Sequence, residues 1–203
     1  MQDYPQNFPP FFLGQGYSAK AGLRSIPHFD SDNFGIVFEE IGLGEAVGKM
    51  ISASGFPYKN WSLLGRAYDL RIPVTVHVAL GTDIIHFHPQ VRGEAVGKAS
   101  LRDFFLFCSI VEGLEGGGVF INIGSAVILP EVFLKALSLT RNRGKKLENF
   151  SAAIFDFIYH YRPYQNVVKR TLTGKGRGFY FIGHHEIMIP LLAASLKSAT
   201  RKK

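Results

Sequence analysis

The sequence contains one cysteine, Cys108, and one tryptophan among its 203 residues. A single cysteine excludes an internal disulfide, and its place within the apolar run FFLFCSIV predicts a small buried hydrophobic side chain. No apolar run reaches the roughly 20 residues that a membrane span needs, because charged residues or glycines interrupt each run. The N-terminal stretch MQDYPQNFPPFF lacks the basic segment of a secretory signal. These absences predict a cytoplasmic protein without a membrane segment.

Charged residues make up only 19% of the chain, whereas 46% of it is hydrophobic. This composition supports one sizeable core and argues against extensive disorder. The net charge of +7 arises mainly from three late basic runs, RNRGKK, KRTLTGKGR and KSATRKK. Because no aromatic-interleaved or helix-in-groove motif accompanies these runs, we do not expect nucleic-acid binding. An anionic small ligand or an acidic protein partner accounts for the charge equally well.

Short apolar segments alternate with helical patterns, which is typical of an α/β protein with a parallel sheet and right-handed crossovers. The predicted strands are rich in β-branched or apolar residues, as strands covered on both faces are: PVTVHVAL, VFINIG and FSAAIFDF. We predict an irregular segment over residues 1–32, a Rossmann-like α/β domain with helices on both sheet faces over residues 33–198, and a basic tail over residues 199–203.

Helical periodicity and capping residues predict five helices. One begins near Ser100, whose hydroxyl can cap it with Asp103 in a capping box, and Gly144 suits the C-cap of a later one. The five helical segments are FGIVFEEIGLGEAVGKMISA, WSLLGRAYDL, LRDFFLFCSIVEGL, PEVFLKALSLTRNRG and HEIMIPLLAASLK.

Polar residues follow three predicted strands, at the edge where ligands bind in open parallel sheets. The stretches are GTDIIHFH, NIGSAV and the run from FDF into YRP. Gly124 and Ser125 form a small turn that can cradle a phosphate together with the start of the next helix. The alternative is a turn required only for close packing of strand and helix. No G-x-G-x-x-G is present, so this motif alone does not establish dinucleotide binding.

Glycines 174, 176 and 178 lie within a basic segment that contains Lys175. Such a loop can fold over an anion, or shield a lysine that becomes a nucleophile, although solvated surface charge is the alternative. Histidines 86, 88, 184 and 185 leave open a metal-dependent hydrolase, but none has the spacing of a zinc-binding helix. We therefore predict no metal and expect hydrogen-bonding roles for the histidines.

Several segments resemble a known family. The run IPVTVHVALGTDIIHFHP, the run LRDFFLFCSIVEGLEGGGVFINIGSAVILPEVFLKALSL, the motif YRP and the run GHHEIMIPLLAASL look like a group of bacterial proteins distantly similar to deoxyhypusine synthase. ALGTDIIHFH resembles the synthase strand ending PALTDGS-GD-I-FH, and NIGSA stands where the synthase has a GGG strand end. Further along its chain, the synthase has an ARP segment, which Tyr161 to Pro163 resemble, and a WGK segment, which Gly174-Lys175 resembles. The resemblance covers about residues 60–198.

The resemblance implies a shortened Rossmann-like domain that binds NAD and either transfers an aminoalkyl group from a polyamine-like substrate or oxidises an amine. It also implies a homo-oligomer. The family's basic position would be Lys175 or Arg177. The expected catalytic residues are Lys175, His88 and His185, and the expected cofactor-binding residues are Gly81, Asp83, Gly124, Ser125 and Arg162. A binding or assembly protein without catalysis is the alternative.

Overall fold

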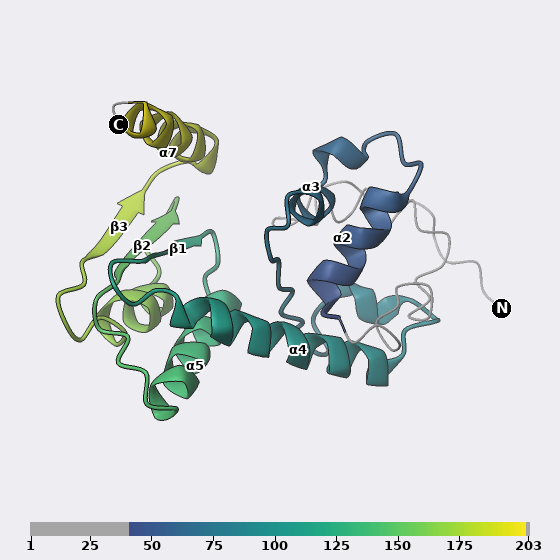
Figure 1. The fold of residues 1–203 in the computed structure, drawn as a ribbon, viewed down its shortest axis with the longest axis horizontal. Helices are drawn as coiled ribbons and strands as arrows, with labels where there is room; N and C mark the ends of the chain where they lie inside the picture. The colour runs from purple at the N-terminus through teal and green to yellow at the C-terminus, as the bar shows by residue number, and fades with distance from the viewer. Residues whose placement is uncertain (1–40, 202–203) are drawn as a thin grey trace. The chain divides into compact units, whose positions relative to one another are not determined.

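The computed structural model describes residues 41–201, which form an α/β structure (Figure 1). The chain divides into two compact units after Asp103, here called the first unit and the second unit. The described part of the first unit contains α2 (Leu43–Ala53), η1 (Lys59–Trp61), α3 (Leu63–Asp69) and η2 (Ile84–Phe87). Helix α4 (Gly93–Glu112) begins in the first unit and ends in the second.

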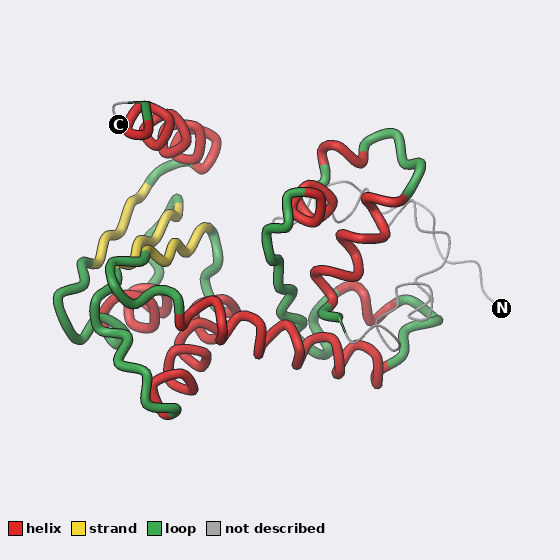
Figure 2. The backbone as a smooth tube through the Cα atoms, in the orientation of Figure 1, coloured by secondary structure: helices red, strands yellow, loops and turns green. Residues whose placement is uncertain are grey.

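The second unit alternates strands with helical segments (Figure 2). Its elements are β1 (Val119–Ile123), α5 (Ile128–Asn142), β2 (Ser151–Asp156), α6 (Tyr161–Pro163), the π-helical turn η3 (Tyr164–Lys169), β3 (Gly178–Ile182) and α7 (His185–Thr200). The strands are parallel and lie in the order β1-β2-β3. The predicted α/β class and the predicted strands β1 and β2 are therefore confirmed, whereas β3 was not predicted.

One face of the sheet carries the core of the second unit. Successive strand residues point to opposite faces, and the register places Phe120, Ala152 and Gly178 side by side on this face. Phe120 stacks on Phe133 of α5, with ring centroids 3.6 Å apart. Cys108, near the end of α4, is 3% exposed and packs into the same cluster, as its apolar surroundings predicted.

The opposite face of the sheet is more open. The apolar side chains of its outer strands, Ile121, Ile123, Phe179 and Phe181, are between 38% and 45% exposed, whereas Ala153 and Phe155 of the central strand are buried. The sequence predicts helices on both faces of the sheet, but within residues 41–201 the side chains of the outer strands stay partly exposed to solvent. An apolar strand pattern indicates burial without indicating what covers each face.

The predicted strand PVTVHVAL is not a strand in the structure, because residues 73–79 have no strand partner among the described residues. The amide of Val76 instead donates to Oδ2 of Asp103 over 2.9 Å. The side chains of Val76 and Val78 pack against the cluster around Leu43 and Ile51 of α2. The apolar pattern thus reflects burial beside a helix rather than membership of a sheet.

Helix α4 begins at Gly93 and not near Ser100, so the predicted capping box is wrong. The segment GEAVGKAS contains alanines, a glutamate and a lysine, which favour an earlier helical start. Asp103 lies within the helix and is fully buried. Its Oδ2 accepts a hydrogen bond of 3.0 Å from the amide of Gly44, so Asp103 caps α2 instead of its own helix.

Candidate functional site

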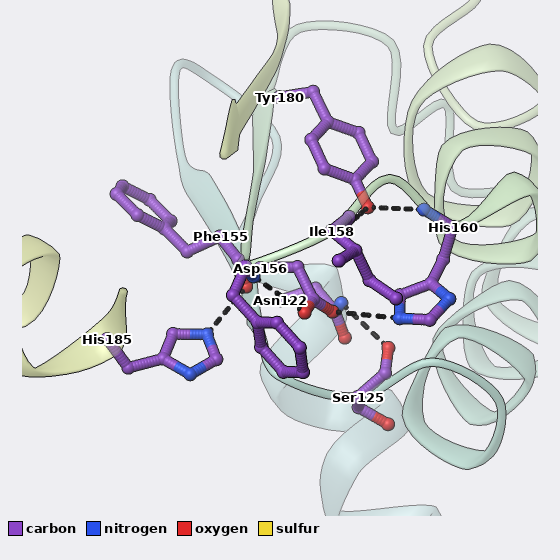
Figure 3. A network of polar contacts seen from close by, with 9 residues as sticks. Asn122, Ser125, Phe155, Asp156, Ile158, His160, Tyr180 and His185 are labelled. Atoms are coloured by element: carbon purple, nitrogen blue, oxygen red, sulfur yellow. Dashed lines mark hydrogen bonds and ion pairs between the residues drawn. The ribbon is translucent and has the colours of Figure 1, made fainter. Parts of the chain in front are cut away.

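Polar side chains gather where β1 and β2 end and where α7 begins (Figure 3). We call this group the carboxyl edge and define it as Asn122, Gly124, Ser125, Asp156, His160 and His185. The ends of parallel strands meet at one edge of a sheet, so residues distant in the sequence come together there. Open α/β sheets bind their ligands at this edge.

The turn after β1 depends on Gly124, whose φ is +66°. This backbone conformation suits glycine because a side chain would be strained. The amide of Gly124 donates to the carbonyl of Phe155 over 3.0 Å, which ties the turn to β2. A Cβ at Gly124 would lie 3.2 Å from Cε1 of His185, so the glycine also lets the imidazole pack closely over the turn. Nε2 of His185 is 3.2 Å from the same Phe155 carbonyl.

Ser125 is 2% exposed and holds the turn to the start of α5. Its hydroxyl accepts a hydrogen bond of 3.2 Å from the amide of Leu129, in the first turn of the helix. Its carbonyl accepts a hydrogen bond of 3.0 Å from Nδ2 of Asn122. Both contacts lie within the chain, so Ser125 positions the turn and the helix N-terminus.

Two buried oxygen atoms at the carboxyl edge accept no hydrogen bond from residues 41–201. They are Oδ2 of Asp156 and Oδ1 of Asn122, and both residues are 2% exposed. The other oxygen of Asp156 accepts from the amide of Phe157 over 2.8 Å. The strand register places the two residues on the same face of adjacent strands. A buried acceptor without a donor costs about 1–3 kcal/mol, so these atoms indicate where a donor group can bind.

His160 lies beside Asp156. Its Nε2 is 3.7 Å from Oδ2 of Asp156, and its side chain is 31% exposed. The backbone amide of His160 donates to the hydroxyl of Tyr180 over 2.9 Å, and this hydroxyl donates in turn to the carbonyl of Ile158 over 3.2 Å. Burial raises the pKa of Tyr180, so its hydroxyl stays protonated at neutral pH. Tyr180 therefore fixes the backbone that carries the imidazole.

Arg162, predicted to bind the cofactor, is paired within the chain. Its Nη1 lies 3.1 Å from Oε1 of Glu131, in the first turn of α5. The same oxygen accepts a hydrogen bond of 2.7 Å from Nδ2 of Asn166. The Glu131 carboxylate thus links α6 and η3 to the amino end of α5, and it offsets the charge of Arg162.

Lys175 does not lie at the carboxyl edge. It precedes β3, which places it at the opposite, amino edge of the sheet, and its side chain is exposed. The glycines around it serve close packing, because a Cβ at Gly176 would overlap the carbonyl of Phe150 and one at Gly178 would overlap Val168. The structure explains this loop by packing and does not bring Lys175 together with Gly124, Ser125 and His185.

The stretch GTDIIHFH lies in the first unit and does not end a strand of the sheet, so the prediction that it shares the edge with the other two polar strand ends is wrong. Asp83 accepts a hydrogen bond from the amide of Ala79, and Gly81 has a φ of +84°. These contacts form a local turn. Nδ1 of His88 accepts from the amide of Gln90 over 3.3 Å.

The sequence prediction placed the stretches NIGSAV and FDF to YRP at this edge, but it did not single out Asn122, Asp156 and His160 as site residues. A signal was present for two of them, because Asn122 and Asp156 are polar residues within otherwise apolar strands, VFINI and SAAIFD. A buried polar residue near a strand end is typical of a functional site. His160 carried no comparable pattern, since only the loop after β2 brings it back to Asp156.

The described residues, 41–201, contain no group of three or more His, Cys, Asp and Glu side chains arranged to hold a metal ion. His86 and His88 lie in the first unit, whereas His184 and His185 lie in the second. The four histidines of the hydrolase alternative thus belong to different units.

A comparison of the chain with protein families, curated proteins and solved structures finds no significant match. The resemblance to deoxyhypusine synthase therefore stays a prediction from sequence. Among residues 41–201, no helix combines the length and the apolar character that crossing a membrane requires.

Proposed function

We propose that the second unit binds NAD at the carboxyl edge, as one half of a Rossmann-like fold. The observation that carries the proposal is the buried Oδ2 of Asp156, the last residue of β2, which accepts no hydrogen bond from the described residues. Dinucleotide-binding domains place an acidic side chain after the first strand–turn–helix, where it accepts hydrogen bonds from ribose hydroxyls. Asp156 follows β1, the Gly124 turn and α5 in the same order.

The architecture around Asp156 supports the same proposal. Three sequential parallel strands joined by helical crossovers are the content of one mononucleotide-binding half of a Rossmann fold. The Gly124 turn leads into α5, whose amino end favours a negatively charged group such as a pyrophosphate. The imidazole of His185, which packs over Gly124, would lie beside a group bound at this turn.

NAD supplies a hydride acceptor, so the proposed chemistry is the oxidation of a small amine or hydroxyl substrate. In this proposal Asn122 and Asp156 orient the bound hydroxyl or amide donors, and the Gly124 turn positions the phosphates. Transfer of an aminoalkyl group through Lys175 is the part of the predicted chemistry that the geometry does not support, because Lys175 precedes β3 at the other edge.

Calorimetric titration of NAD into the full chain tests the proposal. We expect saturable binding that Asp156→Asn weakens by about tenfold or more, because a hydrogen bond to a charged group contributes roughly 1.5–3 kcal/mol. Asp83→Asn is the matched control and should leave the affinity unchanged, since Asp83 caps a local turn in the first unit. Absence of saturable binding, or equal affinities of wild type and Asp156→Asn, would refute NAD binding at this edge.

A second candidate function is assembly without catalysis. The specific observation in its favour is the open face of the sheet, where Ile121, Ile123, Phe179 and Phe181 are partly exposed. Exposed apolar side chains grouped on one face mark surfaces that associate. In this candidate, the open face pairs with the same face of a second copy of the chain, in line with the predicted homo-oligomer.

A further inference from the structure

The loop before β3 turns two of its glycines inward. A Cβ at Gly174 would lie 2.8 Å from the carbonyl oxygen of Glu148, and a Cβ at Gly176 would overlap the carbonyl of Phe150. Both glycines therefore face the backbone of the residues that lead into β2. Without side chains at these two positions, the loop lies directly against that backbone.

The residues that alternate with these glycines carry positive charge. Successive residues of an extended segment point to opposite sides, so Lys175 and Arg177 point away from the backbone that the glycines face. Both side chains are exposed, and neither forms an ion pair with residues 41–201. Residues 169–177 include no Asp or Glu, so no acidic residue of this segment offsets their charge.

The alternation continues into β3. Phe179 and Phe181 occupy the next two alternate positions and are 45% and 39% exposed on the open face of the sheet. Along alternate positions from 175 to 181, the chain thus presents two exposed cations and then two partly exposed phenylalanines. This order of side chains can distinguish one extended partner from another.

The backbone of β3 has a vacant side. Within residues 41–201, β3 is an outer strand that pairs only with β2 (Figure 1). The amide of Ala152 in β2 donates to the carbonyl of Arg177 over 2.8 Å. Alternate residues of a strand bond to opposite neighbours, so Gly178 and Tyr180 direct their amides and carbonyls to the outer edge. Such an edge can pair with a further strand.

We propose that the outer edge of β3 and the two cations before it bind an extended acidic segment of a partner protein, which adds to the sheet as a further strand. Acidic residues at alternate positions of the segment meet Lys175 and Arg177. Apolar residues at the next alternate positions meet Phe179 and Phe181. In strand addition, main-chain hydrogen bonds provide affinity and alternate side chains provide specificity. NAD binding is independent of this surface, since Lys175 precedes β3 whereas Asp156 ends β2.

The chemistry of this surface favours a peptide over a nucleic acid. Phosphates could pair with the cations, but a nucleic-acid backbone has no amides and carbonyls to continue the ladder along β3. Residues 169–177 include no aromatic side chain on which a base could stack. The ring of Phe181 already stacks on that of Phe155 in β2, with centroids 4.7 Å apart. A peptide strand can satisfy the backbone edge, the cations and the apolar rings together.

Fluorescence anisotropy on the full chain tests the proposal with a labelled peptide in which threonine alternates with two glutamates and then two valines. We expect saturable binding. Lys175→Glu combined with Arg177→Glu should weaken it about tenfold or more, because two attractive contacts become repulsive. Lys197→Glu combined with Arg201→Glu is the matched control. It makes the same change in net charge at exposed residues of the last helix and should change the affinity less than about twofold, since distant charges are screened.

A second comparison uses wild type alone and does not depend on the folding of a variant. The same peptide with lysine in place of each glutamate should not bind. Absence of saturable binding of the glutamate peptide, equal binding of both peptides, or equal weakening by the two pairs of substitutions would overturn the proposal.

Hydrogen exchange separates strand addition from attraction between charges alone. The bound glutamate peptide should slow amide exchange within Gly178–Ile182 and leave exchange in α7 unchanged, because the new hydrogen bonds form along β3. Binding without slower exchange in β3 would mean that the cations attract the peptide without adding a strand, which contradicts the proposal.

Two further outcomes would assign this surface to another occupant and overturn the proposal. The first is duplex DNA that binds wild type more tightly than the peptide and displaces it. The second is a wild-type dimer that Lys175→Glu with Arg177→Glu converts to single chains in light scattering, because the edge would then join two copies. We expect the peptide to remain bound in the presence of DNA and the mass to be the same in wild type and variant.

Discussion

Asp103 shows how one buried carboxylate organises the first unit. Its Oδ2 accepts from the amides of Gly44 and Val76, so a side chain of α4 satisfies both the start of α2 and the extended segment that precedes η2. Gly42 has no side chain, and a Cβ there would overlap the same carboxyl group. Burial raises the pKa of Asp103 above its ordinary value of 3.8, against the opposing effect of the backbone hydrogen bonds.

The raised pKa predicts a pH dependence of stability. The folded chain retains a proton on Asp103 that the unfolded chain releases above pH 3.8, so this contribution to the free energy of unfolding is greatest below pH 3.8 and falls as the pH rises through the raised value. Asp103→Asn keeps an acceptor oxygen and does not titrate. Urea unfolding of both proteins between pH 4 and pH 7 should show wild type losing stability relative to Asp103→Asn as the pH rises.

A control for this prediction lies on the same helix. Glu94→Gln removes a carboxylate whose side chain is 75% exposed, and it should leave the pH profile of wild type unchanged. If the stability difference between wild type and Asp103→Asn is constant from pH 4 to pH 7, the Asp103 carboxyl group does not titrate differently in the folded and unfolded chains.

At the scale of elements, the loop before β3 is shaped by backbone contact. The carbonyl of Phe150 occupies the space that a Cβ at Gly176 would need. Gly176→Ala should therefore lower the free energy of unfolding by about 1–3 kcal/mol, since the strand and the loop must move apart. Gly97→Ala in α4 is the control: nothing lies within 4 Å of its Cβ position, and alanine favours a helix, so thermal melting should show no loss of stability. Equal melting temperatures of wild type and Gly176→Ala would contradict this account of the loop.

At the scale of the whole molecule, the open sheet face predicts self-association. Phe179 is 45% exposed on β3, an outer strand of the sheet, beside Phe181. If the face joins two copies, Phe179→Glu should shift the mass measured by light scattering from that of a dimer to that of a single chain. Leu63→Glu, at a residue of the first unit that is 78% exposed, should leave the dimer intact. A wild-type protein that stays monomeric at high micromolar concentration would contradict the assembly candidate.

The sequence predicted those elements whose local pattern agrees with their surroundings. VFINIG and FSAAIFDF are strands as predicted, and Gly144 takes the positive φ expected at the end of α5. PVTVHVAL carries an equally strong strand pattern, but it meets α2 and Asp103 instead of another strand, which no local pattern reveals. The strand GFYFI was missed because it directly follows a glycine-rich basic loop.

The candidate site was predicted only in part, because local sequence patterns locate strand ends and helix starts but not tertiary contacts. Gly124, Ser125 and His185 do come together, since each lies at the end of a strand or the beginning of a helix in the sheet unit. Asp83 was assigned to the same edge only because the strand before it was mispredicted. The pairing of Asp156 with His160 depends on the path of the loop after β2, which tertiary contacts determine.

Helix α4 continues without interruption across the division after Asp103. Asp103 supplies the cap of α2, and Cys108 and Val111, less than three turns further along the helix, fill the core of the second unit. A recombinant fragment cut at the division would place each of these residues at a fraying helix end. Neither unit can therefore be expressed separately by cutting the chain at the division, and a gene fragment that encodes either unit has to include the whole helix.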